Sequence, residues 1–132
     1  MYRCYDTFDK KWIKDNIYLS PYGELYIFKK RFFGRSKLNI LSSERYVVHK
    51  YIGLVDKDDV FVYEGDIVEA QVDKDKIVQG VVVFATELSA YIILCSNVDE
   101  FYTLGTEICQ YIKVIGNVFD NEDESKEQGS QY

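Results

Sequence analysis

Two carboxylates, Glu64 and Asp66, flank Gly65 at a spacing that a general acid and a general base could use. Such a pair also needs a cleft and shifted pKa values, and nothing in the surrounding sequence indicates either. Asp in a turn more commonly accepts hydrogen bonds from nearby backbone amides, while Gly supplies a positive φ. We therefore interpret Tyr63, Glu64, Gly65 and Asp66 as a structural turn motif between two strands.

His49 is the only histidine, and the three cysteines, Cys4, Cys95 and Cys109, are far apart in the sequence. Zinc sites use short spacings between Cys and His ligands, so the sequence predicts no metal site, and it contains no cofactor-binding motif. A cysteine and a histidine can still meet in space and form a nucleophile. An enzyme that uses His49 with a cysteine or a carboxylate is therefore one alternative, although we expect no catalytic residues.

A run of cations and rings forms the most specific candidate contact site, with the residues Lys29, Lys30, Arg31, Phe32, Phe33, Arg35 and Lys37. Proteins that bind single strands place cations against phosphates and aromatic rings against bases. A nucleic-acid-binding β-barrel that uses Lys29 to Lys37 is thus a further alternative. The simpler interpretation is a solvated hairpin loop whose two rings pack back onto the core, and we favour it.

The composition indicates one soluble domain that is rich in strands. The chain has 132 residues, of which 47% are hydrophobic, and its 12 Tyr and 8 Phe suit the pleat of a sheet. The net charge of −6 disfavours binding to phosphate backbones. No apolar run is long enough for a membrane helix or resembles a signal peptide, so we expect no membrane partner and a cytoplasmic protein with reduced thiols.

Short apolar runs separated by turn residues predict an all-β fold with little or no helix, either a small partly open barrel or curled antiparallel sheets. The predicted strands are 2–6, 11–13, 16–19, 25–28, 45–52, 60–63, 67–72, 77–84, 90–95 and 107–119. The run 77–84 is the strongest strand signal and predicts a central strand. Gly80 inside it indicates a bulge or a close approach of another backbone.

The end of the chain differs from the rest, because residues 120–131 contain no apolar side chain to bury and many acidic ones. We predict a single β domain over residues 1–119 and a disordered acidic tail over residues 120–132.

Several motifs together resemble the YopX-like family of small proteins from phages and prophages of Gram-positive bacteria. The most specific is Val62-Tyr63-Glu64-Gly65-Asp66-Ile67-Val68, preceded by Gly53-Leu54-Val55-Asp56-Lys57. Residues 2–6 with 10–12, residues 80–84 and residues 114–121 are similar to further parts of the family pattern. Where the family has a glycine in the turn, this chain has Asp59, so we expect a longer turn or one of another type.

The resemblance implies a mainly β fold, a phage or prophage origin, a bacterial host cell and self-association, and it supplies no catalytic residues. We therefore expect a non-enzymatic accessory protein that acts through protein–protein contacts, with copies of itself or with an unknown host or phage protein. Abundant Tyr and Phe, which are enriched at interfaces, agree with this expectation.

Overall fold

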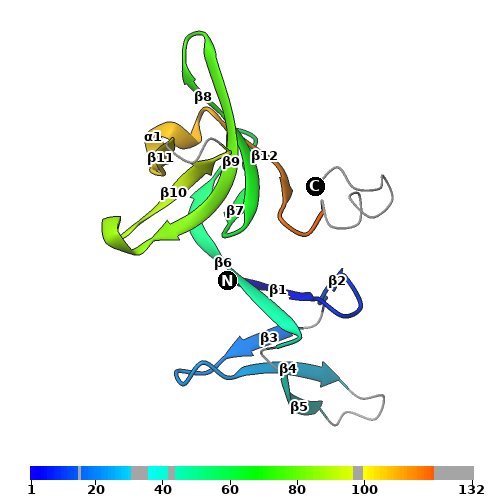
Figure 1. Ribbon diagram of the computed structural model, residues 1–132. Helices are drawn as coiled ribbons and strands as arrows, with labels where there is room; N and C mark the ends of the chain where they lie inside the picture. The colour runs from blue at the N-terminus through cyan, green and yellow to red at the C-terminus, as the bar shows by residue number, and fades with distance from the viewer. Residues whose placement is uncertain (15, 31–35, 42–43, 97–99, 121–132) are drawn as a thin grey trace. The chain divides into compact units, whose positions relative to one another are not determined.

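The computed structural model describes residues 1–14, 16–30, 36–41, 44–96 and 100–120. It divides the chain into two compact units, unit 1 (Met1–Lys50) and unit 2 (Tyr51–Tyr132), each of which is described by itself. Every strand pair in both units is antiparallel, as Figure 1 shows. The prediction of an all-β fold made of curled antiparallel sheets is confirmed.

The first strand of unit 1 is central to a small sheet. β1 (Tyr2–Asp6) pairs with the short β2 (Lys11–Trp12) on one side and with the first half of β6 (Tyr46–Val55) on the other. Cys4, Tyr5 and Asp6 are buried, and so is His49 on β6. The pairing of β1 with β2 makes a hairpin of the predicted strands 2–6 and 11–13, the second of which ends at Trp12.

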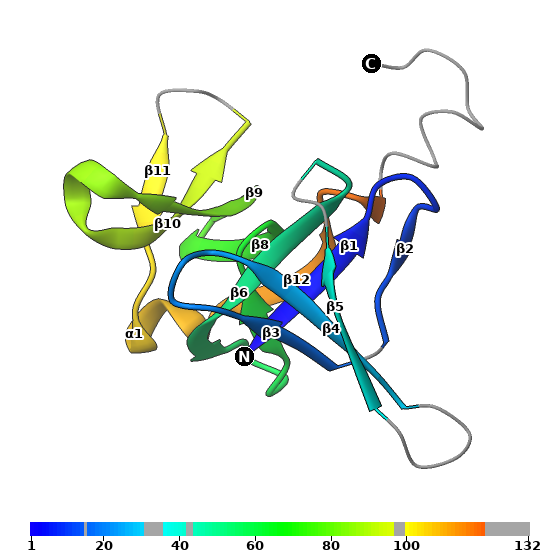
Figure 2. The same ribbon diagram turned by 90° about the horizontal axis from the view of Figure 1, so that it is seen from below.

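A second sheet of unit 1 contains β3 (Asn16–Leu19), β4 (Leu25–Lys30) and β5 (Ser36–Leu41), in the order β3-β4-β5. Figure 2 shows these strands from below. The turn between β3 and β4 contains Gly23 at a φ of 81°, which an L side chain rarely adopts. Leu25 and Ile27 are buried on one face of β4, so this sheet presents its other face outward.

Unit 2 is built on a five-stranded sheet in the order β11-β10-β9-β8-β12. The strands of this sheet are β8 (Asp66–Asp73), β9 (Lys76–Ala85), β10 (Ala90–Cys95), β11 (Phe101–Thr103) and β12 (Ile112–Asn117). Unit 2 also contains β7 (Phe61–Tyr63), which lies outside this sheet. β7 pairs with the second half of β6. The buried cluster inside this unit is Val62, Val68, Ala70, Val78, Val82, Ile93, Cys95, Leu104, Cys109 and Ile112.

The prediction that β9 is central is confirmed, because it pairs with both β8 and β10. At Gly80 the neighbouring strand β10 comes very close, because a Cβ there would lie 2.6 Å from the backbone oxygen of Leu94. The irregular registers of this sheet lie elsewhere, between Gln71 and Asp73 and between Val114 and Gly116. Of the two interpretations of Gly80, close approach is therefore the correct one.

The prediction of one strand over residues 107–119 is wrong at its start. The structure has a four-residue helix, α1 (Thr106–Cys109), before β12, and a short 3-10 helix, η1 (Thr86–Leu88), after β9. Strand alternation would put Ile108 and Cys109 on opposite faces. In the helix Cys109 is buried and Ile108 packs against the same cluster, which favours the helical conformation.

At the turn where the family pattern has a glycine, Asp59 itself takes the left-handed conformation, at a φ of 62°. Its backbone N–H donates to the backbone oxygen of Asp56 at 3.1 Å. Asp tolerates this region better than most residues other than Gly and Asn, so this turn forms without a glycine. The tail predicted over residues 120–132 lies outside the described residues except for Asp120.

Candidate interaction surfaces

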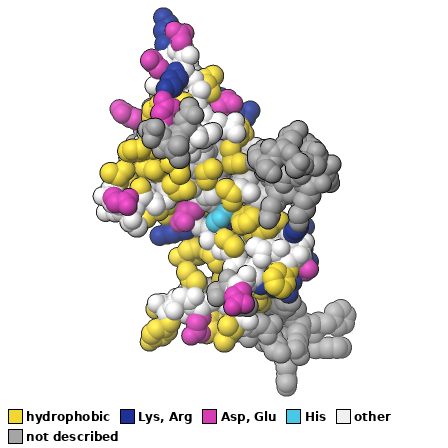
Figure 3. Space-filling view, viewed as in Figure 1, with side chains coloured by type: hydrophobic (Ala, Val, Ile, Leu, Met, Phe, Trp, Pro, Cys, Tyr) yellow, Lys and Arg dark blue, Asp and Glu magenta, His cyan; other side chains and the backbone are white. Residues whose placement is uncertain are grey.

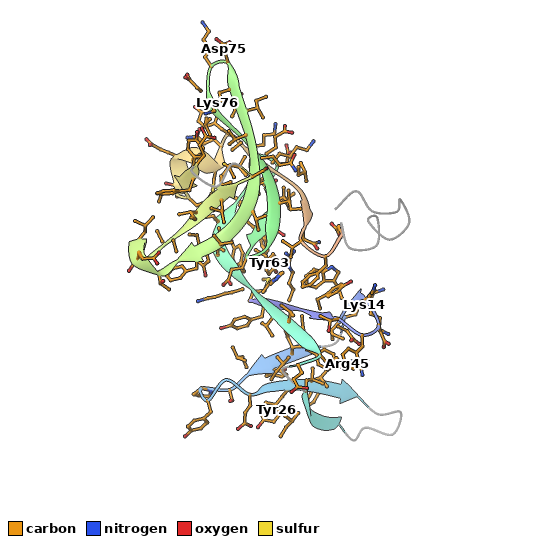
Figure 4. All side chains as sticks on the ribbon, in the orientation of Figure 1. Lys14, Tyr26, Arg45, Tyr63, Asp75 and Lys76 are labelled. Atoms are coloured by element: carbon orange, nitrogen blue, oxygen red, sulfur yellow. The ribbon has the colours of Figure 1, made fainter. Side chains whose placement is uncertain are left out.

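Unit 1 contains a hollow of about 720 Å³ between the β2 segment, β4, β5 and the start of β6. We call it the basic hollow; it is lined by Asp6, Asp9, Lys11, Trp12, Ile13, Lys14, Ile27, Leu41, Arg45 and Tyr46. Figure 4 labels Lys14 and Arg45 in this unit, and Tyr26 on β4. Its volume falls in the range of about 300–1,000 Å³ that is typical of ligand pockets.

One guanidinium organises the polar wall of the basic hollow. The Arg45 Nε–H donates to Asp6 Oδ1 at 2.8 Å, and its Nη2–H groups donate to Asp6 Oδ2 at 2.7 Å and to Asp9 Oδ2 at 3.0 Å. Arg45 also lies over the rings of Phe8 and Tyr46. Both carboxylates are thus paired with this one cation, which is held in place by four neighbours.

Two other cations line the same hollow without such partners. Lys11 and Lys14 are exposed, and neither ammonium group forms an ion pair within the part of the chain that the structure describes. Trp12, between them in sequence, is half-buried and packs against Tyr5, with ring centroids 5.1 Å apart. The basic hollow therefore combines available positive charge with an apolar wall, which suits an acidic ligand.

His49 and Cys4 lie on neighbouring strands but do not have the protonation states of a nucleophilic pair. Burial raises the pKa of the Cys4 thiol to about 11, and burial together with the Arg3 charge lowers the pKa of His49 to about 4. At neutral pH the thiol is protonated and the imidazole is neutral, whereas a catalytic pair needs a thiolate. Arg3 Nη2 lies 3.4 Å from His49 Nδ1, and the Trp12 ring lies beside both residues, with its centroid 4.5 Å from Arg3 Cζ and 5.8 Å from the centre of the His49 ring.

The turn motif that includes Glu64 and Asp66 connects β7 to β8. Gly65 has a φ of 80°, and the buried Asp66 accepts a hydrogen bond from the backbone N–H of Tyr63 at 2.8 Å. Glu64 accepts one from the Tyr91 hydroxyl at 3.0 Å. Figure 4 shows where Tyr63 lies. Asp66 therefore has a local partner of the kind that fixes a turn, and Glu64 connects the turn to Tyr91 on β10.

Asp56 lies in the motif Gly53–Lys57, for which the sequence predicted no role, and it is a buried anchor of unit 2. Its Oδ1 accepts hydrogen bonds from the backbone N–H groups of Asp58 and Val60, and its Oδ2 accepts one from Val114 on β12. Burial raises its pKa and these three amides lower it, with a net lowering. The only sequence signal for this role is an aspartate at the start of a turn.

Each unit has a sheet face on which exposed apolar side chains lie beside half-buried ones. In unit 1, Tyr18, Tyr26 and Ile40 are aligned across β3, β4 and β5, and Ile40 is 67% exposed. In unit 2, Ile67, Val81, Leu94 and Phe101 are aligned across β8, β9, β10 and β11, and Phe101 is 50% exposed. We call these the unit 1 row and the unit 2 row. Figure 3 shows hydrophobic side chains gathered over β9 and β10.

The basic run predicted as a contact site is only partly described. Lys29 and Lys30 belong to β4 and Lys37 to β5, where Lys29 is the register partner of Lys37. Arg31, Phe32, Phe33 and Arg35 lie outside the described residues.

No metal-binding cluster of three or more His, Cys, Asp or Glu side chains occurs among the described residues. Within the same residues, no helix has the length and apolar character needed to cross a bilayer.

Comparison with known proteins identifies the family and the fold. No curated protein matches the chain. The X-ray structure of protein yopX from Bacillus subtilis is similar with a TM-score of 0.64 and 17% identity, over 92% of this chain and 94% of that one. Protein EF1440 from Enterococcus faecalis is similar with a TM-score of 0.51 and 21% identity, over 93% of this chain and 95% of that one. Residues 1–123 match the YopX protein family, and the chain therefore belongs to it.

Proposed function

We propose that this chain is a non-enzymatic accessory protein of a phage or prophage, which acts in the host cytoplasm through protein contacts, above all with copies of itself. The observation that carries this proposal is the opposite charge of the two units. Unit 1 has 11 Lys and Arg against 5 Asp and Glu, a net charge of +6. Unit 2 has 5 against 17, a net charge of −12.

Such a distribution favours contact between unlike units of two molecules. Two copies that approached through the same unit would repel each other, whereas unit 1 of one copy attracts unit 2 of the next. A contact between different surfaces is heterologous, so it closes into a ring or continues as a chain of molecules. The unit 1 row and the unit 2 row provide exposed apolar area that such a contact could bury.

The absence of a thiolate or of a charged imidazole supports the non-enzymatic part of the proposal. Burial raises the pKa values of Cys4, Cys95 and Cys109, which keeps all three thiols protonated and unreactive at neutral pH. Glu64 and Asp66 have hydrogen-bond partners within their own unit.

Light scattering over a wide range of protein and salt concentrations tests the proposal. We expect the mass to rise with protein concentration at about 0.1 M salt and to fall towards that of the monomer at about 1 M, because the Debye length shortens from about 10 Å to about 3 Å. A strict monomer at low salt over the whole concentration range would contradict self-association.

Binding of single-stranded nucleic acid by Lys29 to Lys37 is the second candidate, favoured by the net charge of +6 on unit 1. We expect a salt-dependent shift of an oligonucleotide that is lost when Lys30, Arg31 and Arg35 are changed to Glu. An unchanged shift with the same salt slope would exclude this site.

A further inference from the structure

We propose that the basic hollow of unit 1 binds the acidic segment 120–132 of a second copy of this chain. The inference rests on the proposed self-association and specifies which parts of two molecules meet. It adds a site that is separate from the run Lys29 to Lys37.

The hollow has the charge that an acidic segment needs. Arg45 is paired with both Asp6 and Asp9 and neutralises one of their two negative charges, so the attraction for an incoming carboxylate comes from the two lysines of the hollow. Lys11 and Lys14 contribute two ammonium groups that form no ion pair within the described residues. A unit with a net charge of +6 surrounds them, which strengthens the attraction for a negatively charged chain.

The hollow also has an apolar part, formed by Trp12, Ile13, Ile27 and Leu41. Ile27 is buried and forms the most enclosed part of this lining. Side chains of this kind suit the aliphatic stems and the ring of a peptide better than a small inorganic anion.

The segment 120–132 is the part of the chain that best matches this chemistry. It contains five acidic residues, Asp120, Glu122, Asp123, Glu124 and Glu127, against one basic residue, Lys126, and it includes Tyr132. Twelve residues beyond Asp120 can span about 40 Å when extended, which is enough to reach a neighbouring molecule.

Two charge variants test the proposal by complementation. The hollow variant carries Lys11→Glu and Lys14→Glu, and the tail variant carries Glu122→Gln, Asp123→Asn, Glu124→Gln and Glu127→Gln. Each variant alone should associate at least tenfold more weakly than the original chain in light scattering. A mixture of the two should associate as a pair, because the intact hollow of the tail variant meets the intact tail of the hollow variant.

Trp12 provides a direct reading of the site, because it lines the hollow and is the only tryptophan in the chain. A synthetic peptide of residues 119–132, added to the tail variant, should change the Trp12 fluorescence with saturation. The same peptide with the four neutral substitutions should bind at least tenfold more weakly. The matched control, Lys57→Glu with Lys113→Glu, alters two exposed lysines of unit 2 by the same charge and should leave peptide binding unchanged.

The outcomes separate this inference from the proposed function. If the tail variant associates as strongly as the original chain, the segment is not the occupant, although self-association stands. If the original chain is a monomer at every concentration, the proposed function itself is wrong. If a single-stranded oligonucleotide changes the Trp12 signal at lower concentrations than the peptide does, the hollow is a nucleic-acid site and the inference is overturned. Circular dichroism of both variants establishes that they remain folded.

Discussion

Arg45 and Asp6 form a bidentate ion pair within unit 1, with Nε–Oδ1 and Nη2–Oδ2 distances of 2.8 and 2.7 Å. The Asp6 carboxylate is 2% exposed and also accepts hydrogen bonds from the backbone N–H groups of Phe8 and Asp9. The backbone oxygen of Arg45 in turn accepts hydrogen bonds from the backbone N–H and the hydroxyl group of Thr7. This pair fixes the turn after β1 against the start of β6.

The change Asp6→Asn should lower the melting temperature severalfold more than Asp9→Asn. The first change removes the charge that holds Arg45 and weakens four hydrogen bonds, whereas Asp9 is exposed and makes one of the contacts with Arg45. The Arg45 guanidinium also holds the pKa of Asp6 well below its ordinary value of 3.8. The stabilising effect should therefore be complete above that value and be lost at lower pH. Equal melting temperatures for the two variants would contradict this role.

His49 should make the protein less stable as the pH falls from about 6.5 to about 4. Its pKa is lowered from 6.5 to about 4 in the folded chain, mainly by burial and secondly by the Arg3 charge. The unfolded chain then binds a proton that the folded chain excludes, so the free energy of unfolding should fall by up to about 3 kcal/mol in this window. Chemical denaturation at a series of pH values measures this.

The control is His49→Gln, which should flatten the dependence between pH 6.5 and 5, where carboxylates are still largely ionised. Since His49 is the only histidine, its imidazole resonance in an NMR titration is unambiguous. A midpoint near 6.5 in the folded protein would show that the ring is not desolvated as described.

The change Gly80→Ala should destabilise unit 2 by about 1–3 kcal/mol, because the added methyl group meets atoms that cannot move away freely. A Cβ there would lie 2.6 Å from the Leu94 backbone oxygen and 2.7 Å from Cγ2 of Ile93. Gly105→Ala is the matched control, since no atom lies within 4 Å of its added Cβ and its φ of −160° is extended. Urea unfolding of both variants compares the two, and a loss that is no larger for Gly80→Ala would refute the close approach.

The change Asp56→Ala should cost about 2–4 kcal/mol, because it leaves three backbone N–H groups without their charged acceptor. Asp58→Ala, two residues away on the exposed side of the same turn, should cost far less. Thermal unfolding distinguishes the two. Similar melting temperatures would mean that water replaces the carboxylate at little cost.

Much of the fold follows from the sequence, for reasons visible in particular residues. The β-branched run with Gly80 predicts a central strand, and Pro21 with Gly23 predicts the turn between β3 and β4. The start of the last predicted strand was wrong, because the short apolar pair Ile108 and Cys109 does not distinguish a strand from a helix by its period, and only packing against the buried cluster selects α1.

The candidate surfaces were harder to predict, because they depend on residues that only the folded chain brings together. Lys11 and Lys14 are separated from Leu41 and Arg45 by about thirty positions, yet all four line one hollow. The net charge of −6 likewise does not reveal that the two units carry opposite charges. Nothing in the sequence indicates where to divide the chain, because the boundary at Lys50 and Tyr51 lies inside the continuous strand β6.

The hydrogen bond from Val114 to Asp56 spans 58 positions of the sequence, so during synthesis it forms only after both residues have been made. A ribosome that adds about 5–20 residues per second makes the turn after β6 several seconds before it makes β12. During that interval the Asp56 carboxylate has only its two local donors, and the edge of β8 that β12 will cover is unpaired. Arrival of β12 therefore completes unit 2 late in synthesis, and shortened chains that end before Val114 should be prone to aggregation.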